Sequence, residues 1–173
     1  MARISLCASV GSLLLFAYCL VACDVRVTDK QLIDKFNVKR TDFEMLVEMA
    51  NQDRRVVRIA SDFIWLDDNL NWPRPESDLG MSKERWDQYR SLFVKLGLRG
   101  GISRRTDLPK AIFLIAATEG ISLGGSAKGY VFSSEPLSPL VDSLDDVSAP
   151  MKDRVPIYRK VADNWYLYYE VGS

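Results

Sequence analysis

The sequence predicts an α+β fold in which two to three helices pack on one face of an antiparallel sheet of about four to five strands. Helical patterns cluster in residues 28–97, whereas most strand patterns follow in residues 111–171. Helices and strands that occupy separate parts of a chain favour this class over one in which they alternate. The chain shows no internal repeat, and its length suits a single domain with one core.

Two helices are predicted near the start of the chain from capping boxes, in which Ser or Thr is followed three residues later by Glu or Gln. The first box, Thr28 to Gln31, predicts a short helix over residues 29–36. The second box, Thr41 to Glu44, predicts a helix that reaches about Gln52. The residues between the two helices, 37–40, are interpreted as a turn.

The clearest helix pattern lies in residues 83–96. Ser82 is a good N-cap, and Glu84 suits the first turn, where the helix dipole favours an acidic side chain. Gly97 ends the pattern, because glycine readily adopts the left-handed conformation that often follows a helix. One face of this helix is apolar, with Trp86, Tyr89, Leu92, Phe93 and Leu96 at helical spacing.

Strands are predicted where Val, Ile and aromatic residues are frequent or alternate with polar ones. Residues 55–66 are interpreted as a strand or a bent strand pair, and Ile102 could begin a short strand. Residues 111–117 form an unbroken apolar run, typical of a central strand that is covered on both faces. The remaining strands are 129–133 and a hairpin of 157–161 and 165–171. Loops are expected at 67–80, 120–128 and 135–156.

The start of the chain carries an export and anchoring signal. Arg3 precedes an uncharged run over residues 4–22, which has the layout of a secretory signal peptide. The run leads into Leu20-Val21-Ala22-Cys23, which resembles the lipobox of bacterial lipoproteins. The resemblance implies that the Cys23 thiol receives a diacylglycerol, that the leader is removed before it, and that the new amino terminus is acylated with a fatty acid such as palmitate. It also implies a signal peptide over residues 1–22, a lipidated tether over 23–27 and a single globular domain over 28–173.

This anchor sets the expected location. Two or more acyl chains hold a protein on a membrane without a spanning helix, since each buried methylene contributes about 0.8 kcal/mol. We expect the domain to face the periplasm or the extracellular side of the cell membrane. Asp24 resembles the signal that retains enterobacterial lipoproteins on the inner membrane, and the choice between inner and outer membrane stays open. The alternative is an uncleaved transmembrane helix, because the run is close to the roughly 20 residues that span a bilayer.

Composition excludes several classes of chemistry. The chain has no histidine, which removes His-based zinc sites, Ser-His-Asp triads and Cys-His dyads. Its cysteines are Cys7, Cys19 and Cys23, so a domain that follows Cys23 has no thiol for a disulfide. Basic and acidic residues number 23 each, which argues against nucleic acid as a partner. We expect no metal and no cofactor.

The glycine-rich stretch over residues 120–129 contains a candidate nucleophile. Ser126 and Lys128 could form a Ser/Lys hydrolase pair, but a lysine serves as the base only where burial lowers its pKa. The stretch does not match a P-loop, because the lysine follows alanine and a strand comes next. The favoured interpretation is a hairpin loop in which glycines adopt positive φ.

Acidic residues in the loops form a second candidate. Asp67 and Asp68, and separately Asp142, Asp145 and Asp146, could offer oxygen ligands to calcium or a carboxylate pair for acid–base chemistry. Neither set has the spacing of an EF-hand. We interpret these residues as solvated loop acids.

Aromatic residues of the last strands form the candidate binding surface. Tyr158, Tyr166 and Tyr168 could stack on sugar rings, which in an envelope protein suggests peptidoglycan. The alternative is packing within the sheet, since strands favour aromatic residues. Exposure of Tyr166 and Tyr168 on the face away from the helices would favour a binding surface.

Two basic clusters complete the candidates. The first contains Arg54, Arg55 and Arg58, and the second contains Arg99, Arg104, Arg105 and Lys110. They could rest on anionic head groups, at about 1 kcal/mol per residue near a charged bilayer. The balanced total charge favours an ordinary surface of ion pairs instead.

These observations predict a membrane-anchored envelope lipoprotein without catalytic activity, whose domain binds another protein or an envelope component. By analogy with other lipoproteins of this size, an immunity or inhibitor protein is one version of this hypothesis. The alternatives are an envelope hydrolase that uses Ser126 and Lys128 or a carboxylate pair, and a structural part of an envelope assembly. The expected partners are the lipid bilayer, through acylated Cys23, and a protein of the envelope.

Overall fold

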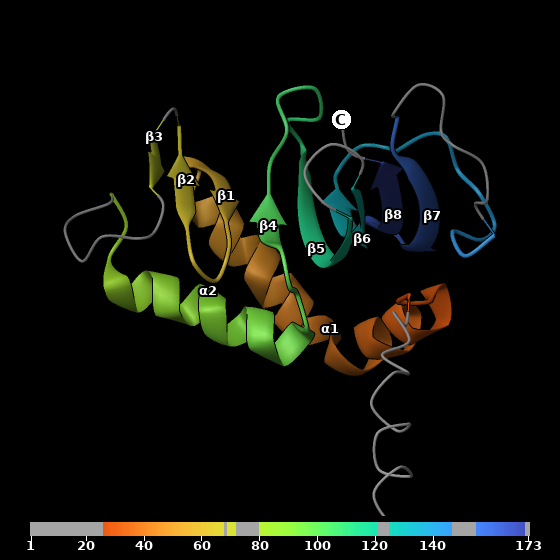
Figure 1. Cartoon of the computed structure of the whole chain (residues 1–173), viewed down its shortest axis with the longest axis horizontal. Coiled ribbons are helices and arrows are strands. Elements are labelled where there is room, and N and C mark those ends of the chain that lie inside the picture. Colours follow the sequence, from red (N-terminus) through yellow and green to blue (C-terminus); the bar gives the residue numbers. More distant parts are fainter. Residues whose placement is uncertain (1–25, 68, 72–79, 121–124, 147–154, 172–173) are drawn as a thin grey trace, which may run out of the picture.

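The computed structural model describes residues 26–67, 69–71, 80–120, 125–146 and 155–171. Within these residues the chain forms two layers (Figure 1). Two helices, α1 (Asp29–Gln52) and α2 (Lys83–Leu96), lie along one side of a single sheet. The α+β class predicted from the sequence is confirmed.

The sheet is larger than predicted. The described residues contribute eight strands in the order β3-β2-β1-β4-β5-β6-β8-β7, and neighbouring strands are antiparallel throughout. The strands are β1 (Val56–Ile59), β2 (Ile64–Leu66), β3 (Asn69–Asn71), β4 (Gly101–Ser103), β5 (Ala111–Glu119), β6 (Ser126–Ser133), β7 (Ile157–Ala162) and β8 (Trp165–Val171). The prediction of four to five strands was therefore wrong. β2, β3 and β4 have three residues each, too few for an alternating pattern to show.

α1 replaces the two short helices predicted for its segment. Thr28 accepts a hydrogen bond from the Gln31 N–H and the Gln31 side chain accepts one from the Thr28 N–H, so the first capping box forms. The expected turn over 37–40 is reduced to a kink, where Lys39 leaves helical geometry with φ −118° and ψ 24°. Residues 37–40 contain no glycine or proline, and Arg40 pairs with Glu44 along the helix, which favours its continuation.

α2 has the boundaries that the sequence predicts. The Ser82 hydroxyl accepts a hydrogen bond from the Arg85 N–H at 3.1 Å. Gly97 follows the helix with φ 68°, in the left-handed region. The predicted apolar face is buried, and the Trp86 indole N–H donates to the Ala60 carbonyl at 3.1 Å. Both ends of this helix depend on local signals, which explains why the prediction succeeded.

The main core lies between the helices and the sheet. Phe36 and Phe43 of α1 pack with Tyr130 of β6 and Trp165 of β8, with ring centroids between 4.5 and 6.3 Å apart. The buried Tyr130 hydroxyl donates to the Leu32 carbonyl at 3.0 Å. These aromatic contacts fix α1 against the centre of the sheet.

A second hydrophobic cluster covers the opposite face of the sheet. Tyr158, Tyr166 and Tyr168 pack there with Phe113 and Leu137. The three tyrosines are 2%, 4% and 0% exposed, respectively. The prediction that they form a binding surface was wrong, because the segment around Leu137, which the sequence marks only as loop, covers them.

The predicted leader, Cys23 and Asp24 lie outside the described residues. Among the residues that the structure describes, no helix is both long and apolar enough to cross a membrane. The expected tether is described from Arg26 onward, and Val27 packs against the main core. Val27 therefore fixes the chain against the core directly before α1.

Candidate functional site

Two polar regions stand out on the folded chain, one toward each end of α1. The first, the amino-terminal ion network, consists of Asp29, Lys128, Asp145 and Arg159. The second is a hollow lined by four arginines, the arginine cleft, formed by Arg54, Arg55, Arg104 and Arg105. α1 has 24 residues, so at about 1.5 Å per residue its ends are up to about 36 Å apart.

The amino-terminal ion network surrounds the first residue of α1. The Asp29 side chain is 2% exposed and contacts Lys128 Nζ at 2.7 Å and Arg159 Nη1 at 2.8 Å. Lys128 Nζ also lies 2.5 Å from the Asp145 carboxylate. Backbone groups complete the network, since Asp145 accepts the Asp29 N–H and Asp29 accepts the Leu144 N–H. Two carboxylates and two cations thus tie α1 to β6, β7 and the segment that precedes residue 147.

Hydrogen bonds keep Asp29 in its charged form. Burial alone would raise its pKa, but hydrogen bonds from Lys128, the Leu144 N–H and Arg159 outweigh burial and hold the pKa below its ordinary value of 3.8. Asp145 lies at the start of α1, where the helix dipole favours a negative charge. The network therefore stabilises the first turn of α1 while both carboxylates are ionised.

A cavity of about 220 Å³ beside this network is lined by Ser126 and Lys128, among other residues. The structure thus brings together the two residues of the hydrolase hypothesis. Lys128 donates a hydrogen bond to Asp145 and forms an ion pair with Asp29, and in the described part of the chain no hydrogen bond joins it to the Ser126 hydroxyl. A serine nucleophile needs a neighbouring base that can accept its proton. Lys128 is engaged in ion pairs instead, so this arrangement gives the hydrolase hypothesis no support.

The glycine-rich stretch is a strand from Ser126 onward, so the loop predicted over 120–128 is shorter than expected. Gly120 has the positive φ expected of a turn, 86°. Gly129 is required for another reason: a Cβ there would lie 2.1 Å from the Leu114 carbonyl oxygen. Residues 121–124 lie outside the described residues.

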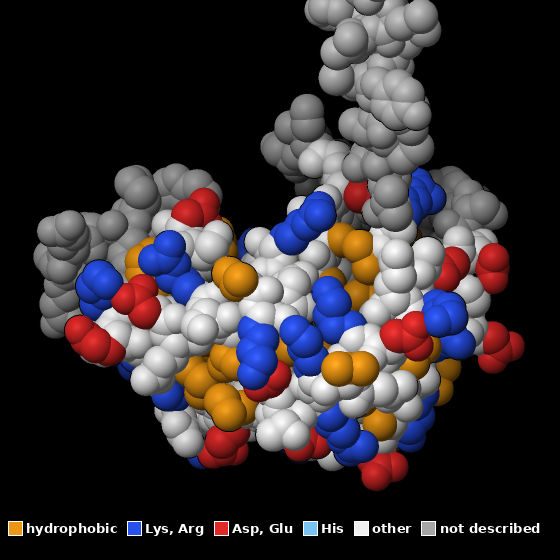
Figure 2. Space-filling view, turned by 90° about the horizontal axis from the view of Figure 1, so that it is seen from below, with side chains coloured by type: hydrophobic (Ala, Val, Ile, Leu, Met, Phe, Trp, Pro, Cys, Tyr) orange, Lys and Arg blue, Asp and Glu red, His pale blue; other side chains and the backbone are white. Residues whose placement is uncertain are grey.

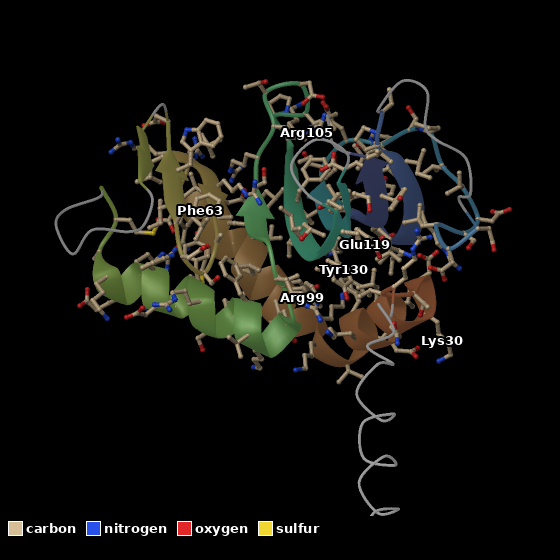
Figure 3. The ribbon with its side chains drawn as sticks, in the orientation of Figure 1. Lys30, Phe63, Arg99, Arg105, Glu119 and Tyr130 are labelled. Atoms are coloured by element: carbon tan, nitrogen blue, oxygen red, sulfur yellow. The ribbon has the colours of Figure 1, made fainter. Side chains whose placement is uncertain are left out.

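The arginine cleft joins two basic clusters that are distant in sequence. β1 and β4 are neighbours in the sheet, and the Arg104 N–H donates to the Val57 carbonyl at 2.8 Å just beyond β4. Arg54 and Arg55 precede β1, and this pairing places them next to Arg104 and Arg105. The hollow has a volume of about 520 Å³. It lies beside the carboxyl end of α1, whose Asn51 lines it, and Figure 3 labels Arg105 on the opposite side of the molecule from α2.

Two of the four arginines have carboxylate partners. Arg55 Nε lies 2.7 Å from Asp67, and both side chains are largely exposed. Arg105 contacts Asp107 at 3.0 Å and Glu170 at 2.7 Å. The hydrogen bonds that Arg105 donates to Asp107 raise the pKa of Arg105, against the effect of burial. These two arginines are thus largely neutralised by their neighbours.

The other two arginines lack a carboxylate partner among the described residues. Arg104 donates to neutral groups, the Ala50 carbonyl at 2.7 Å and the Asn51 side-chain oxygen at 3.3 Å. Burial lowers the pKa of Arg104, and the positive charge of Arg54 acts in the same direction. Arg54 itself is exposed. The arginine cleft therefore carries an excess of positive charge, which an anion would relieve.

The remaining predicted residues do not line the arginine cleft. The Arg58 guanidinium lies 5.2 Å from the Phe63 ring centroid, and Lys110 pairs with Glu135. Arg99 lies on the helix side of the sheet (Figure 3). The basic clusters therefore separate into distinct environments.

The predicted loop acids divide in the same way. Asp67 pairs with Arg55 and Asp145 belongs to the amino-terminal ion network, so neither is simply a solvated acid. Asp142 and Asp146 are exposed, and Asp68 lies outside the described residues. The described residues contain no group of three Asp, Glu, Cys or His side chains that could hold a metal ion.

Sequence reasoning missed Asp29 and Arg159. They are 130 residues apart in the chain, and each looks ordinary in its own segment. An acidic residue at the first helical position is common, and a basic residue in a strand near the end of a sheet is equally common. No local pattern indicated that the two would meet.

No protein-family model matches this chain, and neither a curated protein nor a solved structure matches it. Its function is therefore inferred from the two polar regions and from the anchoring signal.

Proposed function

We propose that this protein is a lipid-anchored envelope lipoprotein without catalytic activity, and that its arginine cleft binds an acidic segment of another protein. Acylated Cys23 attaches the domain to the cell membrane, and the domain faces the periplasm or the extracellular side. An immunity or inhibitor protein would be one form of this activity. The observation that carries the binding proposal is that Arg54 and Arg104 share a single hollow and have no carboxylate partner among the residues that the structure describes.

The chemistry of the arginine cleft supports an acidic protein segment as its ligand. A guanidinium group binds a carboxylate through two parallel hydrogen bonds, which are among the strongest that side chains form. Val57 and Pro109, which are at least partly exposed, also line the hollow, so a ligand meets apolar surface beside the charges. This combination is typical of protein interfaces, where arginine is enriched and often supplies much of the binding energy.

The position of the arginine cleft supports a partner in the envelope. Cys23 lies six residues before Asp29, and six residues span at most about 20 Å. The cleft lies at the other end of α1, which contributes Asn51 to its lining, and Arg105 lies on the opposite side of the molecule from α2 (Figure 3). A domain held at the start of α1 therefore leaves the cleft accessible to a partner.

The amino-terminal ion network supports the same division of roles. Its charges balance one another, and its central carboxylate is buried. Such a network offers little to a ligand but holds the first turn of α1 against the sheet, next to the tether.

The anchor is tested by Cys23→Ser in the producing bacterium. We expect the precursor to retain residues 1–22 and the protein to leave the detergent phase in phase partitioning. The control is Cys19→Ser, which changes a cysteine of the leader and leaves the proposed acylated residue intact. Unchanged processing and partitioning of the Cys23→Ser protein would contradict the anchor.

The binding site is tested by Arg54→Glu in the detergent-solubilised full chain, with poly-L-glutamate as a defined probe. We expect the affinity to fall at least about tenfold, since one charge-assisted hydrogen bond contributes about 1.5–3 kcal/mol. The matched control is Lys160→Glu, which makes the same charge change at an exposed residue outside the cleft. An equal loss in both variants would mean non-specific attraction and would contradict the site.

The natural partner can then be sought by photo-crosslinking from Thr106, an exposed residue that lines the cleft. A crosslinker at Lys160 serves as the comparison in the same cells. The proposal expects a product from Thr106 that disappears in the Arg54→Glu background.

A further inference from the structure

The outer side of the two helices carries a basic group that the proposed function does not use. This helix-side basic patch surrounds the carboxyl end of α2 and consists of Lys35, Lys39, Lys95 and Arg99. In Figure 2, blue Lys and Arg side chains gather near the middle of this side, with orange apolar side chains beside them.

Two lysines of α1 reach the end of α2. Lys39 Nζ donates to the Lys95 carbonyl at 2.7 Å. A Cβ at Gly97 would lie 2.5 Å from Lys35 Nζ, which places this ammonium directly against the same helix end. The last carbonyls of a helix carry partial negative charge, so both lysines also stabilise α2.

These helix contacts leave most of the positive charge without a counter-ion. Within the described residues, the one carboxylate in an ion pair with this patch is Asp42, which contacts Lys95 at 2.7 Å. Lys35, Lys39 and Arg99 have no carboxylate partner there. By contrast, other basic residues of the helices, such as Lys30 and Lys83, pair with acids one turn away.

Exposed apolar side chains flank the patch. Val94, next to Lys95, is 85% exposed, and Val38, next to Lys39, is 81% exposed. Met45 of α1 is half exposed. Apolar side chains that project into solvent among cations are typical of helices that lie in the interface of an anionic membrane.

We infer that the outer side of α1 and α2 rests on an anionic lipid surface, with the helix-side basic patch on lipid phosphates and Val38 and Val94 at the head-group level. The inference rests on the proposed lipid anchor for its geometry, since Asp29 is six residues from Cys23. Val38 is nine residues further along α1, or about 14 Å. In this orientation Arg105 of the arginine cleft, which Figure 3 labels on the opposite side of the molecule from α2, lies away from the bilayer.

The test uses the lipidated protein in vesicles, from which the leader with Cys7 and Cys19 has been removed, and Val94→Cys carries an environment-sensitive fluorophore. The acylated thiol of Cys23 does not react, so the label is specific to the new cysteine. In vesicles of phosphatidylglycerol and phosphatidylcholine, we expect emission at shorter wavelength and protection from an aqueous quencher. In phosphatidylcholine alone, we expect neither. A label at Thr106→Cys, in the arginine cleft, should report water in both cases.

Charge variants test the role of the patch. Lys35→Glu with Arg99→Glu should lower the ratio of shielded to free label by at least about 30-fold, since each basic residue near a charged bilayer contributes about fivefold. Arg54→Glu with Lys160→Glu makes the same change in net charge elsewhere and should leave the ratio unaltered.

The outcomes separate this inference from the anchor. Vesicle flotation reports attachment independently of the label. Attached protein whose Val94 label is equally exposed in both lipids overturns the inference and leaves the anchor intact. Shielding of the Thr106 label instead, or shielding that grows with protein concentration without anionic lipid, also overturns it. Shielding of the Val94 label by anionic vesicles in a Cys23→Ser protein that also carries Cys7→Ser and Cys19→Ser, so that position 94 holds its one thiol, would support the inference even if the anchor failed.

Discussion

The amino-terminal ion network and the arginine cleft are built from the same kinds of side chain but balance their charges differently. In the network, the buried Asp29 contacts two cations, and one of these contacts a second carboxylate. In the arginine cleft, four guanidinium groups line one hollow, and two of them have no carboxylate partner among the described residues. The first region satisfies its own charges, whereas the second has charge left for a ligand.

The comparison teaches how a structural ion cluster can be distinguished from a binding site. A buried charge must be compensated within the fold, because removing one partner leaves the other desolvated and alone. An excess of charge persists only where water or a partner can reach it. The two regions should therefore respond oppositely to substitution: the network in stability and the cleft in binding.

The largest expected effect is the loss of stability in Asp29→Ala. The substitution leaves Lys128 and Arg159 without their shared carboxylate and the Leu144 N–H without its acceptor. We expect a loss of about 3 kcal/mol, at the lower end for a buried pair because Arg159 is partly exposed. Denaturant unfolding of the detergent-solubilised full chain measures it.

Asp34→Ala is the matched control. Asp34 pairs with Lys30 on the same helix, but both side chains are largely exposed, so its removal should cost less than about 0.5 kcal/mol. A comparable loss in the two variants would show that the network contributes no more than a surface pair.

The next largest effect is expected from acid, which should weaken the amino-terminal ion network. The pKa of Asp29 in the fold lies below its ordinary value of 3.8, so the unfolded chain takes up the proton first as the pH falls. The stabilisation is fully present above pH 3.8 and is lost as the pH falls through the lower pKa of the folded state. Unfolding midpoints measured from pH 5 to pH 2 should fall more steeply below pH 3.8 for the natural chain than for Asp29→Asn. Parallel curves would contradict this linkage.

The prediction of structure from sequence succeeded where the signals were local. α2 begins at a capping Ser82 and ends before Gly97, and each signal acts within one turn. The sheet was underestimated because its shortest strands owe their existence to neighbours. β3, for instance, lies within the loop predicted over 67–80 and is held by its pairing with β2, and three residues cannot show that dependence. The kink in α1 was read as a turn because the second capping box resembles a helix start.

In the candidate sites too, the sequence predicted only what depends on local signals. The arginines of the cleft were visible as two separate clusters, but only the pairing of β1 with β4 joins them. Ser126 and Lys128 were visible as a pair, but the carboxylates that engage Lys128 come from α1 and from the segment that precedes residue 147. The tyrosines could be recognised in the sequence as an aromatic stretch. The segment around Leu137 that buries them could not. Residue type is local information, whereas charge balance and burial are set by the fold.

A smaller effect on stability is expected in the arginine cleft from Arg104→Met. The guanidinium group donates to the carboxyl end of α1 through Ala50 and Asn51, and its loss should cost about 1 kcal/mol. Relief from the burial of a charge offsets part of this cost. Thermal or denaturant unfolding measures the change, and a loss as large as that of Asp29→Ala would contradict the distinction between the two regions.

The smallest effect on stability is expected from Arg54→Glu, the same variant that should bind poly-L-glutamate at least about tenfold more weakly. Arg54 is exposed and has no ion pair in the described chain, so its removal breaks no contact that holds the fold. Its replacement also removes the positive charge that lowers the pKa of Arg104. The change in unfolding free energy should therefore stay within about 0.5 kcal/mol, as for most surface substitutions. A variant that lost binding and several kcal/mol of stability together would show that Arg54 supports the fold, and the arginine cleft would then resemble the amino-terminal ion network.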